Sequence, residues 1–123
     1  MDSKDYKIMI VDDSKLARKK LKDCLALLNY TNVIEAADGD EAVSLFKQEK
    51  PNLVFMDIVM PKMFGTDAVK NIVDLDEEAI IVMLSSVGTK THVQESIKVG
   101  ARDFIFKPFT ASRVAEILER YNQ

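Results

Sequence analysis

Five short apolar runs, separated by longer stretches of helical periodicity, are the feature that most constrains the fold of this 123-residue chain. Each run is apolar at successive positions rather than at alternate ones, which is typical of strands covered on both faces. The runs are too short for helices, and most of their residues are β-branched or aromatic. They are Ile8–Val11, Val33–Ala37, Leu53–Met56, Ala79–Leu84 and Phe104–Phe106. We therefore predict five buried strands.

Between these runs, apolar residues recur three or four positions apart, as they do on one face of a helix. The fourth such segment carries Val93 and Ile97 on its apolar face, Ser14 is placed to cap the first, and Gly100 to end the fourth. Crossovers between parallel strands are almost always right-handed, so the helices must cover both faces of the sheet. The predicted fold is an α/β, (βα)5 doubly wound five-stranded parallel sheet that forms a single domain over residues 1–123.

Composition and charge exclude several classes of protein. With 47% hydrophobic and 30% charged residues, the chain should fold as a globule. Its longest apolar runs have about six residues, whereas a membrane-spanning helix needs about 20. A net charge of −3 argues against nucleic acid as a partner. The lone cysteine, Cys24, and the lack of an apolar signal segment predict a cytoplasmic protein without an internal disulfide.

Polar side chains follow four of the predicted strands. Asp12 and Asp13 follow the first, Asp57 the third, Ser85 the fourth and Lys107 the fifth. Parallel strands end at the same edge of their sheet, and in open α/β sheets the ligand crevice lies at that edge. We therefore expect these five side chains to meet at one site.

The chemistry of this group predicts a metal and a phosphoryl group. Three neighbouring carboxylates repel one another and need a cation, and oxygen ligands without His or Cys favour a hard ion, Mg²⁺ above all. The Ser85 hydroxyl and the Lys107 ammonium add a hydrogen-bond donor and a positive charge that together can hold a phosphoryl group. Asp57 stands alone on the central strand and is the best candidate for a nucleophile that forms an aspartyl phosphate.

Four segments around these residues, "IMIVDDS", "FMDIVMP", "VMLSS" and "FIFKPF", resemble the signature segments of the response regulator receiver domain family. The resemblance covers the whole chain. It implies the strand order 2-1-3-4-5 of the flavodoxin-like, CheY-like fold, which the alternation alone does not fix. It also implies a single receiver domain over residues 1–123 with no output domain. Such a chain is not an enzyme, apart from catalysing its own phosphorylation and dephosphorylation.

The same resemblance assigns roles to residues at the carboxyl edge. Asp57 would accept a phosphoryl group from a histidine kinase. Asp12, Asp13, Asp57 and the backbone carbonyl of Val59 would bind Mg²⁺. These assignments agree with the roles that the residue chemistry predicts for the three aspartates.

Further roles follow from the resemblance at the last two strands. Ser85 and Lys107 would contact the phosphoryl group, with a cis peptide bond before Pro108 presenting the lysine. Phe104 occupies the aromatic switch position. The chain departs from the family pattern at Phe64, where a small polar residue is common. It carries apolar residues at two positions that tune the phosphoryl lifetime, Val59 and Val87.

Partners are also implied. The chain is most similar to the single-domain chemotaxis type, which would signal as a monomer by binding a target such as a flagellar switch component. The binding face would comprise the fourth helix, the fifth strand and the fifth helix, roughly residues Lys90 to Tyr121, and a phosphatase is a further possible partner. A phosphorelay intermediate that passes the phosphoryl group to a second histidine is the alternative.

Two other functional classes fit the sequence less well. A dehalogenase-type phosphatase needs an acid two residues after its nucleophile, where this chain has Val59. A flavodoxin-like cofactor-binding protein would hold phosphate in the loop after the first strand, but "DDSKLA" is anionic there. A P-loop nucleotidase is excluded because its Gly-rich motif is missing.

Overall fold

The computed structural model describes residues 1–61, 63–86 and 89–123, in which one five-stranded parallel sheet has the order β2-β1-β3-β4-β5. Each strand is followed by a helix, so the predicted (βα)5 fold and its strand order are confirmed. The strands are β1 (Ile8–Val11), β2 (Val33–Ala36), β3 (Leu53–Asp57), β4 (Ile81–Ser85) and β5 (Asp103–Phe106). The helices are α1 (Lys15–Leu27), α2 (Gly39–Glu49), α3 (Gly65–Leu75), α4 (Lys90–Lys98) and α5 (Ala111–Tyr121).

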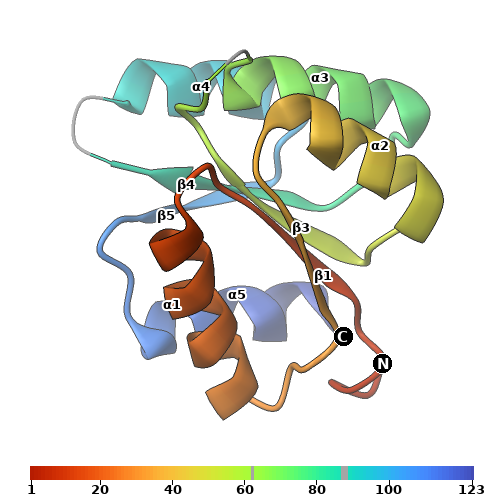
Figure 1. The fold of residues 1–123 in the computed structure, drawn as a ribbon, viewed down its shortest axis with the longest axis vertical. Coiled ribbons are helices and arrows are strands. Elements are labelled where there is room, and N and C mark those ends of the chain that lie inside the picture. The colour runs from red at the N-terminus through yellow and green to blue at the C-terminus, as the bar shows by residue number, and fades with distance from the viewer. Residues whose placement is uncertain (62, 87–88) are drawn as a thin grey trace.

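The helices form two layers around the sheet (Figure 1). α2, α3 and α4 cover one face, whereas α1 and α5 cover the other. Because side chains alternate across a strand, Met9 and Val11 of β1 pack beneath α2 and α3, and Ile8 and Ile10 pack beneath α1 and α5. All residues of β1, β3 and β4 are buried, as continuous apolar runs predict for strands covered on both faces. The prediction of full burial was wrong for the two edge strands, β2 and β5, which are only partly buried. No described helix has the length and apolar character that crossing a bilayer would require.

Helix ends follow the local signals in the sequence. The Ser14 side chain accepts a hydrogen bond from the backbone N–H of Ala17 and caps α1, as predicted. Gly100 follows α4 with a φ of 127°, in the region that favours glycine. A Cβ atom on Gly100 would also lie 2.7 Å from a methyl group of Val73. Both the backbone angle and the lack of space therefore favour glycine at this position.

The predicted apolar face of α4 is confirmed at Val93 but wrong at Ile97. On α4, Val93 and Ser96 are buried, whereas Ile97 is 41% exposed. The hydroxyl of Ser96 lies 3.0 Å from the Thr66 hydroxyl of α3 and donates to the backbone carbonyl of His92 at 2.8 Å. A small hydroxyl side chain therefore faces the neighbouring helix with its polar atom satisfied, which an apolar periodicity does not detect.

A buried carboxylate at the start of β5 was also missed. Asp103 accepts hydrogen bonds from Arg113 at 3.5 Å, from the Tyr121 hydroxyl at 3.1 Å, and from Arg120. All three donors lie on α5, and Arg113 also donates to the carbonyl of Phe104 at 2.9 Å. The network fixes α5 to β5. The apolar pattern of the strand gave no sign of it because Asp103 precedes the apolar run.

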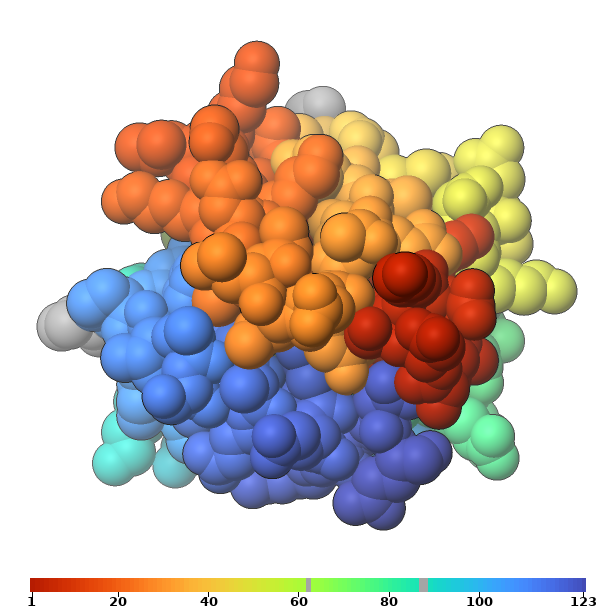
Figure 2. Space-filling model, turned by 90° about the horizontal axis from the view of Figure 1, so that it is seen from below, coloured from red at the N-terminus to blue at the C-terminus, as the bar shows by residue number. Residues whose placement is uncertain are grey.

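The N-terminal and C-terminal segments meet on the face shown in Figure 2, where Asn122 donates to the backbone carbonyl of Met1 at 2.9 Å. Asn122 also donates to the hydroxyl of Tyr30 at 3.2 Å. The Tyr30 ring contacts the Tyr6 ring edge-on, at 5.8 Å between centroids. The Tyr6 hydroxyl is buried and has no hydrogen-bond partner among the described residues.

We expect Tyr6→Phe to leave the free energy of unfolding unchanged or to raise it by up to about 1 kcal/mol, because an unpaired buried hydroxyl costs more than it contributes. The matched change Tyr30→Phe removes the acceptor of the Asn122 bond and should lower that free energy by about 1 kcal/mol. Urea unfolding of both variants tests this. A loss at Tyr6→Phe as large as that at Tyr30→Phe would show that the Tyr6 hydroxyl is paired.

Tyr6→Phe is also expected to change the pH dependence of stability at alkaline pH. Burial, together with Tyr30, raises the pKa of Tyr6 to about 12 from 10.0. Between pH 10 and about 12 the folded chain therefore retains the phenol proton while the unfolded chain loses it. The free energy of unfolding falls as the pH rises through this range. Urea titrations between pH 9 and 11 should show a smaller fall in the free energy of unfolding for Tyr6→Phe than for the wild type.

Candidate functional site

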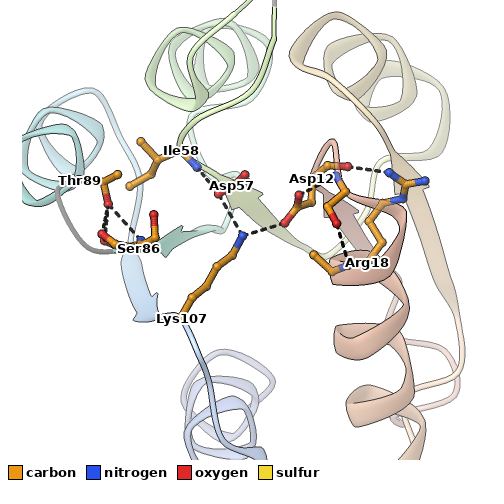
Figure 3. Close-up of polar contacts among 10 residues, drawn as sticks. Asp12, Arg18, Asp57, Ile58, Ser86, Thr89 and Lys107 are labelled. Carbon is orange, nitrogen blue, oxygen red and sulfur yellow. Dashed lines mark hydrogen bonds and ion pairs between the residues drawn. The ribbon is translucent and has the colours of Figure 1, made fainter.

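Three of the side chains predicted to form a site, those of Asp12, Asp57 and Lys107, meet at the carboxyl edge of the sheet (Figure 3). Asp12 directly follows β1, and Lys107 directly follows β5. Asp57 and Ser85 are the last residues of β3 and β4 rather than the first residues beyond them. Both remain in the sheet because they pair with the neighbouring strand, Asp57 with Leu84 and Ser85 with Phe106.

Three carboxylates form an acidic cluster at this edge. One oxygen atom from each of Asp12, Asp13 and Asp57 lies within 4.8 Å of the others. Asp12 is 2% exposed and Asp57 9%, whereas Asp13 is open to solvent. A set of carboxylate oxygens without nitrogen or sulfur donors fits a hard divalent cation such as Mg²⁺. The structure thus brings together the three aspartates that the sequence predicts as metal ligands.

Lys107 bridges two of these carboxylates. Its ammonium group lies 2.9 Å from Oδ2 of Asp12 and 3.3 Å from Oδ1 of Asp57. Figure 3 shows the lysine side chain reaching between the two aspartates. The cis peptide bond between Lys107 and Pro108 is present as predicted. The pair with Asp12 was not predicted, because the resemblance assigned Lys107 to the phosphoryl group alone.

Burial and like charge both act on Asp57. Burial, followed by the negative charge of Asp12, raises the pKa of the Asp57 carboxyl group above its usual value, and Lys107 opposes this change. Burial alone would lower the pKa of Lys107, but its hydrogen bond to Asp12 and the charges of both aspartates raise it. The ionised Asp57 is thus held at a cost that a bound cation would reduce.

The loop after β3 packs closely against Asp57. Oδ1 of Asp57 accepts a hydrogen bond from the backbone N–H of Ile58 at 3.0 Å. Gly65, at the start of α3, donates its N–H to the carbonyl of Ile58 at 2.7 Å. A Cβ atom at Gly65 would lie 2.4 Å from the backbone oxygen of Asp57. Only glycine allows the chain to return this close to the central carboxylate.

Ser85 is buried, and its hydroxyl bonds to a residue that the sequence analysis did not identify. The Ser85 hydroxyl lies 2.7 Å from the hydroxyl of Thr89, which donates in turn to the carbonyl of Ser86 at 2.7 Å. The backbone N–H of Ser86 donates to the same Thr89 oxygen at 3.1 Å. The available signal was a hydroxyl residue four positions after Ser85, just before α4. The predicted contact of Ser85 with a phosphoryl group stays a prediction.

Two aromatic residues of β5 lie beside the predicted site. Phe104, at the predicted switch position, is half-buried, and its ring contacts that of Phe106 edge-on at 5.1 Å between centroids. Phe106 is 62% exposed. Both rings line a cavity of about 540 Å³ between α4 and β5, and Ser85, Lys107, Ser86, Lys90, Val93 and Gln94 complete its walls. The cavity joins two predicted phosphoryl contacts to the predicted output face.

Two of the three residues that depart from the family pattern, Phe64 and Val59, lie in the described part of the chain. Phe64 is half-exposed, and its ring stacks on that of His92 of α4, with 5.2 Å between centroids and 15° between planes. Val59 lies exposed in the loop after β3, and the metal-binding role of its carbonyl stays a prediction. Val87 lies outside the described residues.

Comparison with known proteins adds an independent line of evidence. The profile of the response regulator receiver domain matches residues 8–119. The chain is 44% identical over 117 residues to the chemotaxis protein CheY of Thermotoga maritima, covering 95% of this chain and 98% of the relative. It is 43% identical over 115 residues to CheY of Bacillus subtilis, covering 94% and 96%. The structure of the chemotaxis protein CheY4 of Vibrio cholerae superimposes with a TM-score of 0.85 and 30% identity, covering 94% and 97%.

Proposed function

We propose, because this chain belongs to the response regulator receiver domain family, that Asp57 accepts a phosphoryl group from a histidine kinase. The phosphorylated chain then signals by binding another protein. The observation that carries the proposal is the cluster of Asp12, Asp13 and Asp57 bridged by Lys107. Acidic oxygens and one fixed cation are the equipment that phosphoryl transfer to a carboxylate requires.

In the proposed reaction an Asp57 oxygen attacks the phosphorus atom of the donor's phosphohistidine. A new O–P bond forms while the N–P bond breaks, and its electron pair leaves with the histidine nitrogen. The Lys107 ammonium, 3.3 Å from Asp57, is placed to donate to an oxygen of the transferred group. The Ser85 hydroxyl would exchange its Thr89 partner for a second such oxygen.

A divalent cation completes the proposed site. Asp12, Asp13, Asp57 and the Val59 carbonyl would hold Mg²⁺, which supplies positive charge against the carboxylates and the phosphoryl oxygens. The chain acts on no separate substrate in this proposal. It is a phosphoacceptor that catalyses, at most, its own phosphorylation and dephosphorylation.

The direct test is incubation with acetyl phosphate, a small phosphodonor, followed by intact-mass measurement. With Mg²⁺ the chain should gain one phosphoryl group that is stable in acid and labile to hydroxylamine. Chelation of divalent cations should prevent the gain. Equal labelling with and without the cation would contradict the metal role.

The relatives named chemotaxis protein CheY, at 43–44% identity, support a role in chemotaxis. The proposed donor is a chemotaxis histidine kinase and the proposed target a flagellar switch component, with a phosphatase as a further partner. The proposed location is the cytoplasm, where Cys24 would stay reduced, and the proposed state is a monomer.

We expect activation to change the face formed by α4, β5 and α5, from Lys90 to Tyr121. Ser85 leads toward α4 and Lys107 follows β5, so a phosphoryl group that draws in both would move the walls of the adjoining cavity. Amide-resonance mapping with beryllofluoride, a phosphoryl mimic, should show shifts across this face. Shifts confined to the loop after β3 would assign the output to another surface.

The variant Lys107→Ala separates phosphorylation from this change. It should still accept a phosphoryl group, because the proposed metal ligands and Asp57 remain. It should lose the resonance shifts on α4 and β5, because the Lys107 ammonium group, which links Asp57 to the end of β5, is gone. A variant that showed the full wild-type pattern of shifts would rule out a coupling role for Lys107.

A further inference from the structure

Arg18, on the second turn of α1, contacts the acidic cluster from the side opposite Lys107 (Figure 3). Its Nη1 donates to the backbone carbonyl of Asp12 at 2.7 Å, and its Nε donates to Oε1 of Glu35 on β2 at 3.1 Å. The arginine side chain is 15% exposed. One guanidinium thus joins the end of β1 to the neighbouring edge strand.

The Asp12 carbonyl belongs to the peptide unit that leads to Asp13. Because a peptide unit is planar, fixing its oxygen fixes the direction in which the chain continues to the Asp13 Cα atom. The Asp12 carboxylate is held separately, by the Ser14 N–H at 2.9 Å and by Lys107. The bond from Arg18 therefore orients the peptide unit between the two aspartates and places the Asp13 Cα atom, from which the exposed carboxylate extends.

We propose that Arg18 is a positioning residue that holds Asp12 and Asp13 ready for a divalent cation. The inference rests on the proposed function, because it needs the acidic cluster to bind a cation. An arginine suits the task because its planar guanidinium sends two N–H donors in fixed, different directions. The carboxylate of Glu35 keeps the guanidinium in place, and Lys22 approaches the same carboxylate at 3.5 Å without contacting Asp12 in the described structure.

Positioning and charge have opposite effects on cation affinity. A positive side chain near the site repels a divalent cation, so loss of its charge alone should strengthen binding. Loss of an outer contact that orients a ligand typically weakens metal binding by 10- to 100-fold. The sign of the change at Arg18 therefore shows which effect dominates.

The test is direct titration of the unphosphorylated protein with Mg²⁺ by calorimetry, with no phosphodonor present. For Arg18→Gln we expect the dissociation constant to rise about tenfold. The matched control Lys22→Gln removes a charge from the same helix and a contact with the same Glu35, and it should leave the constant unchanged or lower it. Arg18→Lys keeps the charge but not the two-way donor geometry, and it should weaken binding as well.

Phosphorylation by acetyl phosphate provides a second readout. For Arg18→Gln the Mg²⁺ concentration at half-maximal rate should rise with the dissociation constant, while the rate at saturating Mg²⁺ stays close to that of the wild type. Thermal unfolding and amide spectra confirm that each variant is folded. Should Arg18→Gln not fold, the titration of Arg18→Lys decides in its place.

Each outcome has a definite meaning. Unchanged or tighter Mg²⁺ binding by Arg18→Gln would overturn the inference, as would equal weakening in Lys22→Gln, or binding by Arg18→Lys as tight as in the wild type. Failure of the wild-type protein to bind Mg²⁺ would overturn the proposed function instead. Wild-type binding combined with an unaffected Arg18→Gln would leave the proposed function standing and remove only the role of Arg18.

Discussion

Asp57→Asn is expected to accept no phosphoryl group from acetyl phosphate at any Mg²⁺ concentration. An amide lacks the anionic oxygen that attacks phosphorus, while its shape preserves the end of β3 and the hydrogen bond from the Ile58 N–H. Intact-mass measurement after incubation reports the result directly. Labelling of this variant equal to that of the wild type would place the acceptor elsewhere.

Asp13→Asn is the matched control for this change. It removes the same charge from the same cluster but leaves the proposed nucleophile in place. This variant should therefore still gain one phosphoryl group, at a higher Mg²⁺ concentration than the wild type because one ligand charge is missing. The contrast separates the acceptor from a metal ligand within one cluster.

The same Asp57→Asn variant should be more stable than the wild type when divalent cations are removed. Burial and the charge of Asp12 raise the pKa of Asp57 in the folded chain, so its stabilising contribution is present at low pH and is lost as the pH rises through the folded pKa. At neutral pH the uncharged asparagine side chain causes no such loss of stability. Thermal unfolding in chelator tests this, and the advantage should shrink when Mg²⁺ is added.

Gly65→Ala is expected to have the second-largest effect, on both stability and phosphorylation. The new Cβ atom would lie 2.4 Å from the backbone oxygen of Asp57 and 3.0 Å from the Cα atom of Ile58. Neither neighbour can move without shifting the end of β3. We expect a loss of about 1 to 3 kcal/mol in the free energy of unfolding. Phosphorylation should slow by about tenfold or more, because small displacements of a reacting group are costly.

Gly39→Ala offers a closely matched control at the start of α2. Its Cβ atom would lie 2.7 Å from Sδ and 3.2 Å from Cγ and Cβ of Met63. The flexible Met63 side chain can turn away, and its Cβ atom needs to move by only a few tenths of an ångström. Alanine is also a better helix former than glycine. Stability should therefore change little or rise. Equal losses in the two variants would show that close contact with the Asp57 backbone is not what requires glycine at position 65.

The sequence predicted the three central strands well because burial on both faces leaves a continuous apolar run. It also located the edge strands β2 and β5, although these are only partly buried. Ile8–Val11 has the same bounds in both, and the other strands shift by one or two residues at their ends. The strand order had to come from the family resemblance, since alternation is compatible with several orders. The polar residues at strand ends were found because parallel strands share one carboxyl edge, a property of topology rather than of side-chain detail.

The contacts that the sequence did not reveal depend on side-chain conformation. Thr89 and Asp103 are polar residues outside the apolar patterns. Asp103 bonds to residues of α5, whose position relative to β5 the sequence does not specify, whereas Thr89 bonds to Ser85 and Ser86 close by in the sequence. Ser96 was overlooked because periodicity counts apolar residues, whereas a hydroxyl can occupy a buried face when its hydrogen bonds are satisfied. The bond between Tyr121 and Asp103 follows from the packed fold, whereas the bonds from Ser96 to His92 and from Thr89 to Ser86 are local and were missed because an apolar periodicity takes no account of hydroxyl groups.

The bridge from Lys107 to Asp12 and Asp57 spans 95 and 50 residues of sequence, and this spacing matters while the chain is being synthesised. At 5 to 20 residues per second, Lys107 leaves the ribosome roughly 2.5 to 10 s after Asp57. By then β1 can already pair with β2 and β3. The edge of this nascent sheet carries the negative charges of Asp12 and Asp57 without the Lys107 ammonium group. Docking of β5 adds the missing charge and the cavity beside it together. The bridge can therefore form only once β5 has docked, and a nascent chain that stops before Lys107 cannot carry it.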